Sequence, residues 1–326
     1  MGDDGTGTTK GRASARWGTG DIPDQTGRTV LVTGANSGLG LATAEALAGA
    51  GARVLMACRN AEKAARALQL VAAHAAHRDG PEPEVVSLDL ADLASVQACA
   101  GVVSGLVERL DVLVNNAGVM ALPLRRTADG FEMQFGTNHL GHFALTGHLL
   151  PTLLRADVPR VVTVSSNAHK FGKIRWDDPN WERGRYSKWQ AYGQTKLANL
   201  LFSSELQRRA IAGATNLVAA SAHPGYTATE LSSAGPSLSG NKVMGLATSL
   251  FERVAGQPAA MGALPQLYAA TMPDVGPDEY FGPDGPGEFH GHPTRVGRSD
   301  GASNLTEATR LWKLSERLTS VTYPWP

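Results

Sequence analysis

Short apolar runs alternate with stretches of helical periodicity through the first two thirds of the chain. The runs are continuous rather than alternating, as expected for strands that helices bury on both faces. They predict strands at 29–33, 53–57, 84–88, 111–115, 160–165 and 217–222. The intervening stretches predict a helix from the first glycine loop to about residue 50 and further helices at 61–75, 93–108, 130–154 and 190–211. Repeated β-α units of this kind predict an α/β fold, a doubly wound Rossmann-type parallel sheet of about seven strands.

The pattern changes after His223-Pro224-Gly225. Ser, Gly and Thr dominate residues 226–245, and Gly, Pro and His are dense at 280–301. Helices are expected at about 246–271 and 304–319. Because ligands of doubly wound folds bind outside the carboxyl ends of the strands, we interpret the region 226–301 as a substrate lid and cap.

No low-complexity linker divides the chain, so we expect residues 21–326 to form a single domain. The residues before it, 1–20, are rich in Gly and Thr and have no apolar core. They predict a disordered tail, and they do not resemble a secretory signal.

Composition excludes several classes of protein. The 30 basic residues balance the 30 acidic residues, so no overall field favours nucleic acid or an anionic membrane. The two cysteines, Cys58 and Cys99, argue against a disulfide scaffold or a thiolate zinc site. No apolar run approaches the roughly 20 residues that span a bilayer. The default expectation is a cytoplasmic protein without a metal, a nucleic-acid partner or a membrane partner.

A glycine loop joins the first predicted strand to the first predicted helix. It reads Thr33-Gly34-Ala35-Asn36-Ser37-Gly38-Leu39-Gly40. Glycines let backbone amides approach a pyrophosphate closely, and the helix amino terminus favours negative charge. A glycine-rich turn without a ligand is the alternative, but its position as the first β-α turn favours a dinucleotide site.

The ends of the next two strands carry the residues that would meet the adenosine half of a dinucleotide. The second strand ends in Ala57-Cys58-Arg59-Asn60, without the carboxylate that would select NAD(H). Since the guanidinium of Arg59 can hold a 2′-phosphate, NADP(H) is favoured over NAD(H). Asp89, followed by Leu90, is placed to reach the adenine. Its alternative role as a helix N-cap is weakened because Asp92 competes for it.

Five motifs in register resemble the short-chain dehydrogenase/reductase family over about residues 28–230. They are the glycine loop at 33–40, Asn115-Asn116-Ala117-Gly118, Asn138, Ser165-Ser166 and Tyr192-Gly193-Gln194-Thr195-Lys196. The stretches 57–59, 138–143 and 196–199 further resemble its retinol-dehydrogenase-like branch. The resemblance implies hydride transfer with Tyr192 as general acid/base.

Tyr192 and Lys196 lie four residues apart in one predicted helix and therefore share a face. An ammonium beside a phenol favours phenolate, so we expect Lys196 to lower the pKa of Tyr192. A phenol tuned in this way can donate or accept a proton at a carbonyl or alcohol oxygen. Without the other motifs, a surface contact on a helix would explain the pair equally well.

The remaining catalytic roles come from the resemblance. Ser166, 26 residues before Tyr192, would bond the substrate oxygen, and Asn138 would perturb its helix and connect Lys196 to solvent through a water. The longer interval before Tyr192 contains Trp176 to Trp181 and predicts a loop beside the pocket.

The resemblance also implies contacts at the nicotinamide end of the cofactor. Asn116, Ala117 and Gly118 would lie beneath the ring. Pro224 and Gly225 would bend the chain over it, with Thr229 bonding the carboxamide or a phosphate. We expect His223 to brace this turn, and His139 and His142 to have packing roles rather than to bind a metal.

Three functional hypotheses remain. The first is an oxidoreductase that acts on a small carbonyl or alcohol, whose lipophilic character is suggested by Trp176, Trp181, Met244, Phe251 and Met261. The others are an NADP(H)-binding sensor, and an epimerase or dehydratase on the same scaffold. The family pairs through helices equivalent to 130–154 and 190–211, which predicts a homo-oligomer unless the carboxyl-terminal extension covers that surface.

Overall fold

The computed structural model of the chain describes residues 16–77, 80–227 and 257–326. Its sheet has eight strands in the order β3-β2-β1-β4-β5-β6-β7-β8. They are β1 (Thr29–Thr33), β2 (Arg53–Cys58), β3 (Glu84–Ser87), β4 (Val112–Asn115), β5 (Arg160–Val164), β6 (Val218–Ala222), β7 (Tyr280–Pro283) and β8 (Pro293–Arg295). Strands β1 to β7 are parallel, and β8 pairs antiparallel with β7. The doubly wound fold is therefore confirmed.

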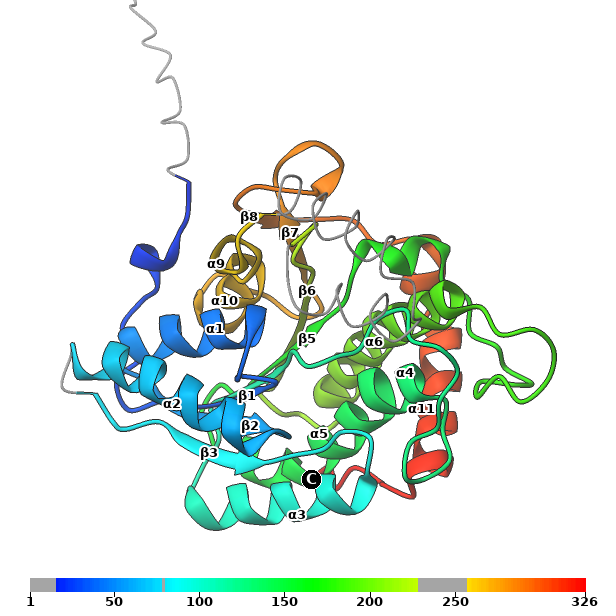
Figure 1. The fold of residues 1–326 in the computed structure, drawn as a ribbon, viewed down its shortest axis with the longest axis horizontal. Helices are drawn as coiled ribbons and strands as arrows, with labels where there is room; N and C mark the ends of the chain where they lie inside the picture. Colours follow the sequence, from blue (N-terminus) through cyan, green and yellow to red (C-terminus); the bar gives the residue numbers. More distant parts are fainter. Residues whose placement is uncertain (1–15, 78–79, 228–256) are drawn as a thin grey trace, which may run out of the picture.

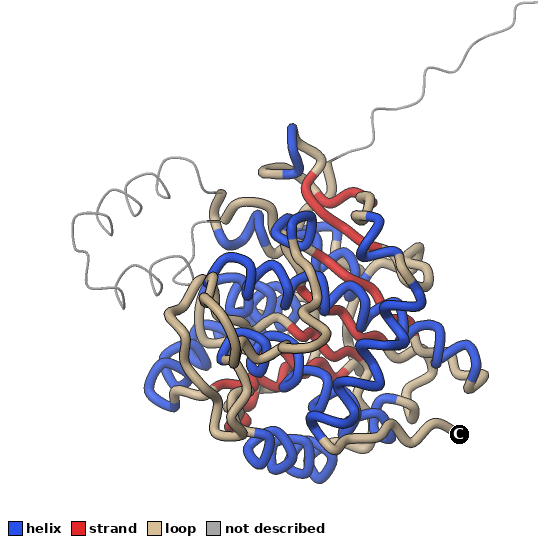
Figure 2. The backbone as a smooth tube through the Cα atoms, turned by 90° about the vertical axis from the view of Figure 1, so that its right-hand side faces the viewer, coloured by secondary structure: helices blue, strands red, loops and turns tan. Residues whose placement is uncertain are grey.

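Helices cover both faces of this sheet (Figure 1; Figure 2 shows the strands between them). One face carries α1 (Gly38–Gly49), α2 (Ala61–Ala76), α9 (Ala259–Gly262) and α10 (Leu264–Thr271). The other carries α3 (Leu93–Leu106), α4 (Met133–Phe135), α5 (Gly141–Leu153) and α6 (Lys188–Ala212), with α11 (Leu305–Thr319) packed outside α6. The strand order reverses between β1 and β4, and ligands bind at such a point.

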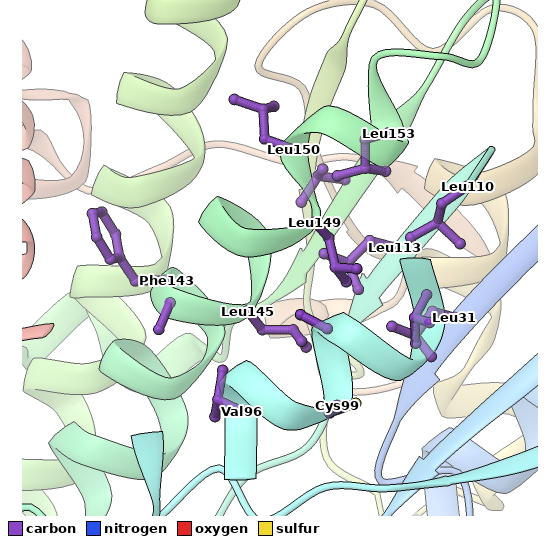
Figure 3. Packing of buried hydrophobic residues seen from close by; sticks show 14 of the residues in the cluster. Leu31, Val96, Cys99, Leu110, Leu113, Phe143, Leu145, Leu149, Leu150 and Leu153 are labelled. Atoms are coloured by element: carbon purple, nitrogen blue, oxygen red, sulfur yellow. The ribbon is translucent and has the colours of Figure 1, made fainter. Parts of the chain in front are cut away.

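Successive residues of β1 enter opposite halves of the core. Val30 and Val32 pack in the cluster beneath α1, α2 and α10, whereas Leu31 packs with α3 and α5. Figure 3 shows the cluster that contains Leu31, in which side chains of β4, α3 and α5 gather, among them Leu113, Cys99 and Leu145. Burial on both sides explains why this strand is apolar at consecutive positions.

The structure corrects the predicted cap. Residues 259–295, assigned to the lid and cap, contain α9, α10, β7 and β8 and so extend the sheet and its helical layer. Strand β7 consists of Tyr, Phe, Gly and Pro, and β8 of Pro, Thr and Arg, so neither carries the strong apolar signal that predicts a buried strand. Residues 228–245 of the predicted lid lie outside the described residues.

The predicted tail is also too long. Within residues 16–20, the Trp17 ring packs edge-on against Tyr268 at 5.2 Å, and its Nε1 donates to Met272 Sδ at 3.3 Å. The segment is therefore part of the fold, and residues 1–15 lie outside the described residues. Over the described ranges, no helix combines the length and the apolar character needed to cross a membrane.

Candidate active site

The turn between β1 and α1 is built for close backbone approach. Gly34 has a φ of +68°, and a Cβ at Gly40 would lie 2.3 Å from the carbonyl oxygen of Gly34. Gly38 opens α1 with a φ of +54°, and Leu39 in the first turn approaches α9 beside Gly262. A side chain at Gly40 would collide with the backbone of Gly34, and side chains at Gly34 and Gly38 would strain the turn.

The amino terminus of α1 is suited to an anion. Ser37 occupies the N-cap position, but its side chain makes no capping hydrogen bond, and the first turn contains no acidic residue. The backbone of the preceding Asn36 lies beside the buried Cys58. The helix dipole and the uncapped N–H groups therefore favour a phosphate here.

The hydroxyl of Thr33 ties this turn to the end of β4. It accepts hydrogen bonds from the N–H groups of Asn116 and Ala117, each at 2.9 Å. The Asn116 side chain donates to the Thr33 carbonyl at 2.8 Å and accepts from Gln266 of α10 at 3.2 Å. Since β1 and β4 flank the switch point, these contacts fix the floor of the candidate site.

The end of β2 presents an exposed cation. The Arg59 side chain is 71% exposed, and its Nη1 lies 3.7 Å from Asp89 Oδ2. Asp89 also accepts from Ala91 N–H, whereas Asp92 caps α3, so Asp89 is not the helix cap. Leu90, which follows Asp89, is buried against Gly141 of α5.

Cys58 is a packing residue at this edge. Its side chain is buried, and burial raises the pKa of the thiol to about 11. A thiol of this kind is protonated at neutral pH and is a poor nucleophile.

Ser166, Tyr192 and Lys196 meet at the carboxyl end of β5. The hydroxyl of Ser166 lies beside the phenol of Tyr192 and accepts from Ala168 N–H at 3.2 Å. Lys196 Nζ donates to the Val164 carbonyl at 3.1 Å. The neighbouring Ser165 donates to the Lys196 carbonyl at 2.8 Å and so anchors α6 to the strand.

The electrostatics of this group differ from the prediction. Burial raises the pKa of Tyr192 to about 12, and the hydrogen bond from Ser166 offsets part of the rise. Burial also lowers the pKa of Lys196 to about 8. The predicted lowering of the Tyr192 pKa by Lys196 is therefore wrong for the protein by itself, because desolvation of the phenol outweighs the nearby charge.

Asn138 lies in a π-helical turn, Gly136–Leu140, which interrupts the predicted helix at 130–154 between α4 and α5. The predicted perturbation of the helix is thus present. The Asn138 amide bonds the backbone of Val119 and donates to Thr195 Oγ1 at 3.1 Å. A Cβ at Gly118 would lie 3.1 Å from Asn138 Oδ1 and 3.9 Å from Lys196 Nζ, so this segment passes close to α6, the catalytic helix that carries Tyr192 and Lys196. The water-mediated relay stays a prediction.

The turn after β6 is braced by His223, as predicted. Its Nδ1 accepts from Gly225 N–H at 3.3 Å, and its Nε2 lies 3.0 Å from Glu288 Oε2. Burial lowers the pKa of His223 to about 3. Gly225 has a φ of +67°, and the Pro224 carbonyl accepts from Gln257 Nε2 at 2.6 Å. Thr229 lies outside the described residues.

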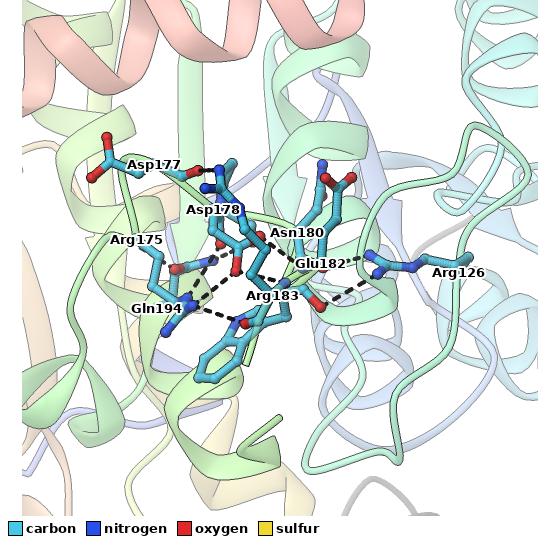
Figure 4. Close-up of polar contacts among 10 residues, drawn as sticks. Arg126, Arg175, Asp177, Asp178, Asn180, Glu182, Arg183 and Gln194 are labelled. Atoms are coloured by element: carbon cyan, nitrogen blue, oxygen red, sulfur yellow. Dashed lines mark hydrogen bonds and ion pairs between the residues drawn. The ribbon is translucent and has the colours of Figure 1, made fainter. Parts of the chain in front are cut away.

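The insert before Tyr192 is fixed by a buried carboxylate (Figure 4). Asp178 accepts from Arg175 Nη2 at 2.8 Å and from the N–H groups of Glu182 and Arg183 at 2.7 and 3.2 Å. Gln194, two residues after Tyr192, accepts from Arg175 N–H and donates to the carbonyl of Pro179 at 2.9 Å. The insert is thus joined directly to the catalytic helix.

The same insert contacts the segment that precedes α4. Arg126 donates to the carbonyl of Asn180, and Asn180 Oδ1 accepts from Glu132 N–H at 3.0 Å. Tyr186 donates to the buried carboxylate of Glu132 at 2.9 Å. Two loops that are far apart in the sequence therefore pack against each other.

The apolar residues once expected to line a pocket have packing contacts. Trp181 is buried beneath the guanidinium of Arg175, whose Cζ lies 4.1 Å from its ring centroid, and Trp176 lies beneath Arg310 at the same distance. Met261 packs against the core cluster beneath α1. Met244 and Phe251 lie outside the described residues.

Four polar residues, Thr33, His142, Gln194 and Gln266, make supporting hydrogen bonds that the sequence analysis did not predict. Each lies within or beside a motif or a core helix, but its partner is distant in the chain. Thr33 and His142 carry a local signal, since each is a polar residue amid apolar neighbours, and such a residue needs a hydrogen-bond partner when it is buried.

Comparison with known proteins agrees with this geometry. The family model of the short chain dehydrogenases matches residues 28–237. Mouse retinol dehydrogenase 14 is 41% identical over 321 residues, which cover 95% of this chain and 91% of that protein. Mouse retinol dehydrogenase 12 is 38% identical over 297 residues, with coverage of 90% and 87%.

Solved structures give the same result. An uncharacterized protein from Mycobacterium paratuberculosis is 45% identical, with a TM-score of 0.78 and coverage of 95% of this chain and 100% of that one. A short chain dehydrogenase from Escherichia coli CFT073, solved with NADPH, is 25% identical, with a TM-score of 0.58 and coverage of 79% and 96%.

Proposed function

Because the chain belongs to the short-chain dehydrogenase/reductase family, in its retinol-dehydrogenase-like branch, it is an oxidoreductase, and we propose that Tyr192 is its general acid/base. The proposed reaction transfers hydride between NADP(H) and the carbonyl or alcohol carbon of a small lipophilic molecule. The observation that carries the proposal is the meeting of Tyr192 and Lys196, whose Nζ lies 5.6 Å from the centroid of the Tyr192 ring, with the hydroxyl of Ser166 beside the phenol.

The described residues fit a dinucleotide. The turn from Gly34 to Gly40 is so closely packed that a Cβ at Gly40 would lie 2.3 Å from the Gly34 carbonyl oxygen, and Ser37 at the start of α1 has a hydroxyl without a capping bond. Arg59 offers an exposed guanidinium where NAD-selective sites carry a carboxylate. These residues support NADP(H) over NAD(H). The E. coli relative solved with NADPH agrees with that preference.

Bound NADP(H) would supply the hydride and, when oxidised, a positive charge near the phenol. Tyr192, a neutral phenol at physiological pH, would donate its proton to the substrate oxygen during reduction, and its phenolate would accept the proton of the alcohol during oxidation. Ser166 would hold that oxygen beside the phenol. Lys196 would stabilise the phenolate left after proton donation.

The carboxyl-terminal segment bears on assembly. The Trp312 ring of α11 stacks on Phe202 and contacts Phe143, and Tyr323 donates to the carbonyl of Phe143 at 2.7 Å. A Cβ at Gly147 of α5 would lie 2.7 Å from the Tyr323 ring. Because the faces of α5 and α6 are covered from within the chain, we propose a monomer. Light scattering on the purified protein tests this.

A panel of aldehydes and ketones of graded apolar bulk, with NADPH oxidation as the readout, tests the activity. The proposal predicts turnover that improves with apolar bulk. Tight NADPH binding without turnover of any carbonyl would instead indicate a sensor, and turnover without net NADPH oxidation would indicate the epimerase or dehydratase class.

A further inference from the structure

The segment after β4 is held at both ends by side chains of other elements. At its start, Thr33 Oγ1 accepts hydrogen bonds from the N–H groups of Asn116 and Ala117. At its end, the Asn138 amide accepts Val119 N–H at 2.7 Å and donates to the Val119 carbonyl at 2.8 Å. Residues 116–119 are therefore fixed beside the catalytic helix.

His142 of α5 lies between these two holding residues. Its Nδ1 is 3.1 Å from the carbonyl oxygen of Asn138, and its Nε2 is 3.0 Å from Thr33 Oγ1. The residue is 1% exposed, so bulk water cannot replace either contact. A single imidazole thus joins the π-helical turn to the end of β1.

The chemistry of the partners determines the tautomer. A carbonyl oxygen can only accept, so the proton of the neutral ring is on Nδ1, and Nε2 is an acceptor. The hydroxyl of Thr33, whose oxygen already accepts two N–H groups, then gives its one proton to Nε2. Its other acceptor, the Val114 carbonyl, is more distant at 3.3 Å. Every polar atom in the series of hydrogen bonds that runs from Asn138 through His142 to Thr33 therefore has a partner.

A neutral ring agrees with the surroundings. Burial lowers the pKa of His142 to about 4, the hydrogen bond to Asn138 raises it in part, and the charge of Lys196 lowers it again. The ring therefore keeps one donor and one acceptor at physiological pH.

We propose that His142 is a positioning residue that fixes segment 116–119 relative to Asn138, and thereby the nicotinamide half of the cofactor site. It acts through Thr33 and Asn138 and touches no reacting atom. The inference rests on the proposed function, because it concerns where NADP(H) binds.

The test compares two ligands that share an adenosine end. NADPH carries both halves of the dinucleotide, whereas adenosine 2′,5′-bisphosphate carries the 2′-phosphate but no nicotinamide. Loss of the His142 contacts should raise the dissociation constant of NADPH by about tenfold, as expected when buried hydrogen-bonding groups lose their partners. The dissociation constant of the bisphosphate should stay within about twofold of the wild-type value. A general loss of folding would weaken both ligands together.

The variants separate the two contacts. His142→Phe removes both, His142→Asn can keep the donation to Asn138, and His142→Gln can keep the acceptance from Thr33. The matched control is His139→Phe, because His139, three residues earlier, is equally buried but bonds Ser315 of α11 at 2.8 Å. The control should lower thermal stability without changing the ratio of the two dissociation constants.

The proposal is supported if the ratio of the NADPH dissociation constant to the bisphosphate dissociation constant rises for His142→Phe and rises less for His142→Asn and His142→Gln. An unchanged ratio in all three variants overturns it, and if His142→Phe does not fold, the Asn and Gln variants decide in the same way. Failure of the wild-type protein to bind NADPH would instead refute the proposed function.

Discussion

Lys196 Nζ lies 5.6 Å from the ring centroid of Tyr192, and burial shifts the two groups toward their neutral forms. The pKa of Tyr192 is raised to about 12, and that of Lys196 is lowered to about 8. The pair is therefore set, in the protein itself, to donate a proton rather than to accept one.

This relationship predicts different pH profiles for the two directions. Carbonyl reduction needs the phenol, which persists well above neutrality, so its rate should be constant between pH 6 and about 8 and fall as Lys196 loses its proton. Alcohol oxidation needs a phenolate, so its rate should rise over the same range. Initial rates in both directions check this, and a reduction rate that climbs from pH 6 to 8 would contradict it.

Buried histidines predict loss of stability in acid. Burial lowers the pKa of His139 to about 3, of His142 to about 4 and of His223 to about 3. Since these folded-state values lie below the ordinary value, the unfolded chain binds more protons as the pH falls below about 6.5. Each histidine should remove about 2 kcal/mol of stability at pH 5.

Urea unfolding at pH 7 and pH 5 measures this loss. His139→Phe serves as the control, because removing one of these histidines should reduce the pH dependence of the free energy of unfolding by about 2 kcal/mol. Equal free energies of unfolding at the two pH values would show that the histidines are already charged in the fold.

The fold and the site motifs were predictable where the signal is local. The strands β1, β2, β4, β5 and β6 are buried on both faces, so each is a largely apolar run. The glycine loop and the pair Tyr192 and Lys196 are fixed by spacing within one turn or one helix. Strands β7 and β8 lack such runs. The network of Thr33 and His142 joins residues 109 positions apart, and no local pattern encodes that contact.

The pKa of Tyr192 was mispredicted for a physical reason. The sequence shows the charge four residues away, but it does not show that the phenol is almost fully buried. Desolvation then exceeds the effect of the ammonium.

The contacts of Asp178 hold the insert in place, and we predict that the insert contributes to substrate binding. Asp178→Ala removes the acceptor for Arg175 and for two N–H groups, and hydrogen bonds to a charged group contribute about 1.5–3 kcal/mol each. The insert should loosen, and KM for the carbonyl should rise several-fold while NADPH affinity stays unchanged. Steady-state kinetics and fluorescence titration measure the two effects.

The control for this prediction is Asp177→Ala, because Asp177 is exposed and only its backbone carbonyl, which the variant keeps, accepts a hydrogen bond from Arg183. An equal rise of KM in both variants would refute a specific role for Asp178.

Arg59 predicts the cofactor preference. Its contact with Asp89 is solvent-exposed and therefore weak, so the guanidinium can turn to a 2′-phosphate. Arg59→Asp should reverse the preference from NADPH to NADH. The control Arg155→Asp makes the same charge change at the exposed end of α5 and should leave the preference unaltered. An unchanged ratio of the two dissociation constants in Arg59→Asp would remove this role.

The central claim, that Tyr192 is the general acid/base, is tested most directly by Tyr192→Phe with NADPH binding measured beside turnover. The variant loses one hydroxyl from a ring that is otherwise buried, so NADPH affinity should stay within about twofold. On any carbonyl that the wild-type protein reduces, kcat should fall by about 10²–10⁴-fold, the usual contribution of general acid catalysis. Turnover near the wild-type rate would contradict the mechanism.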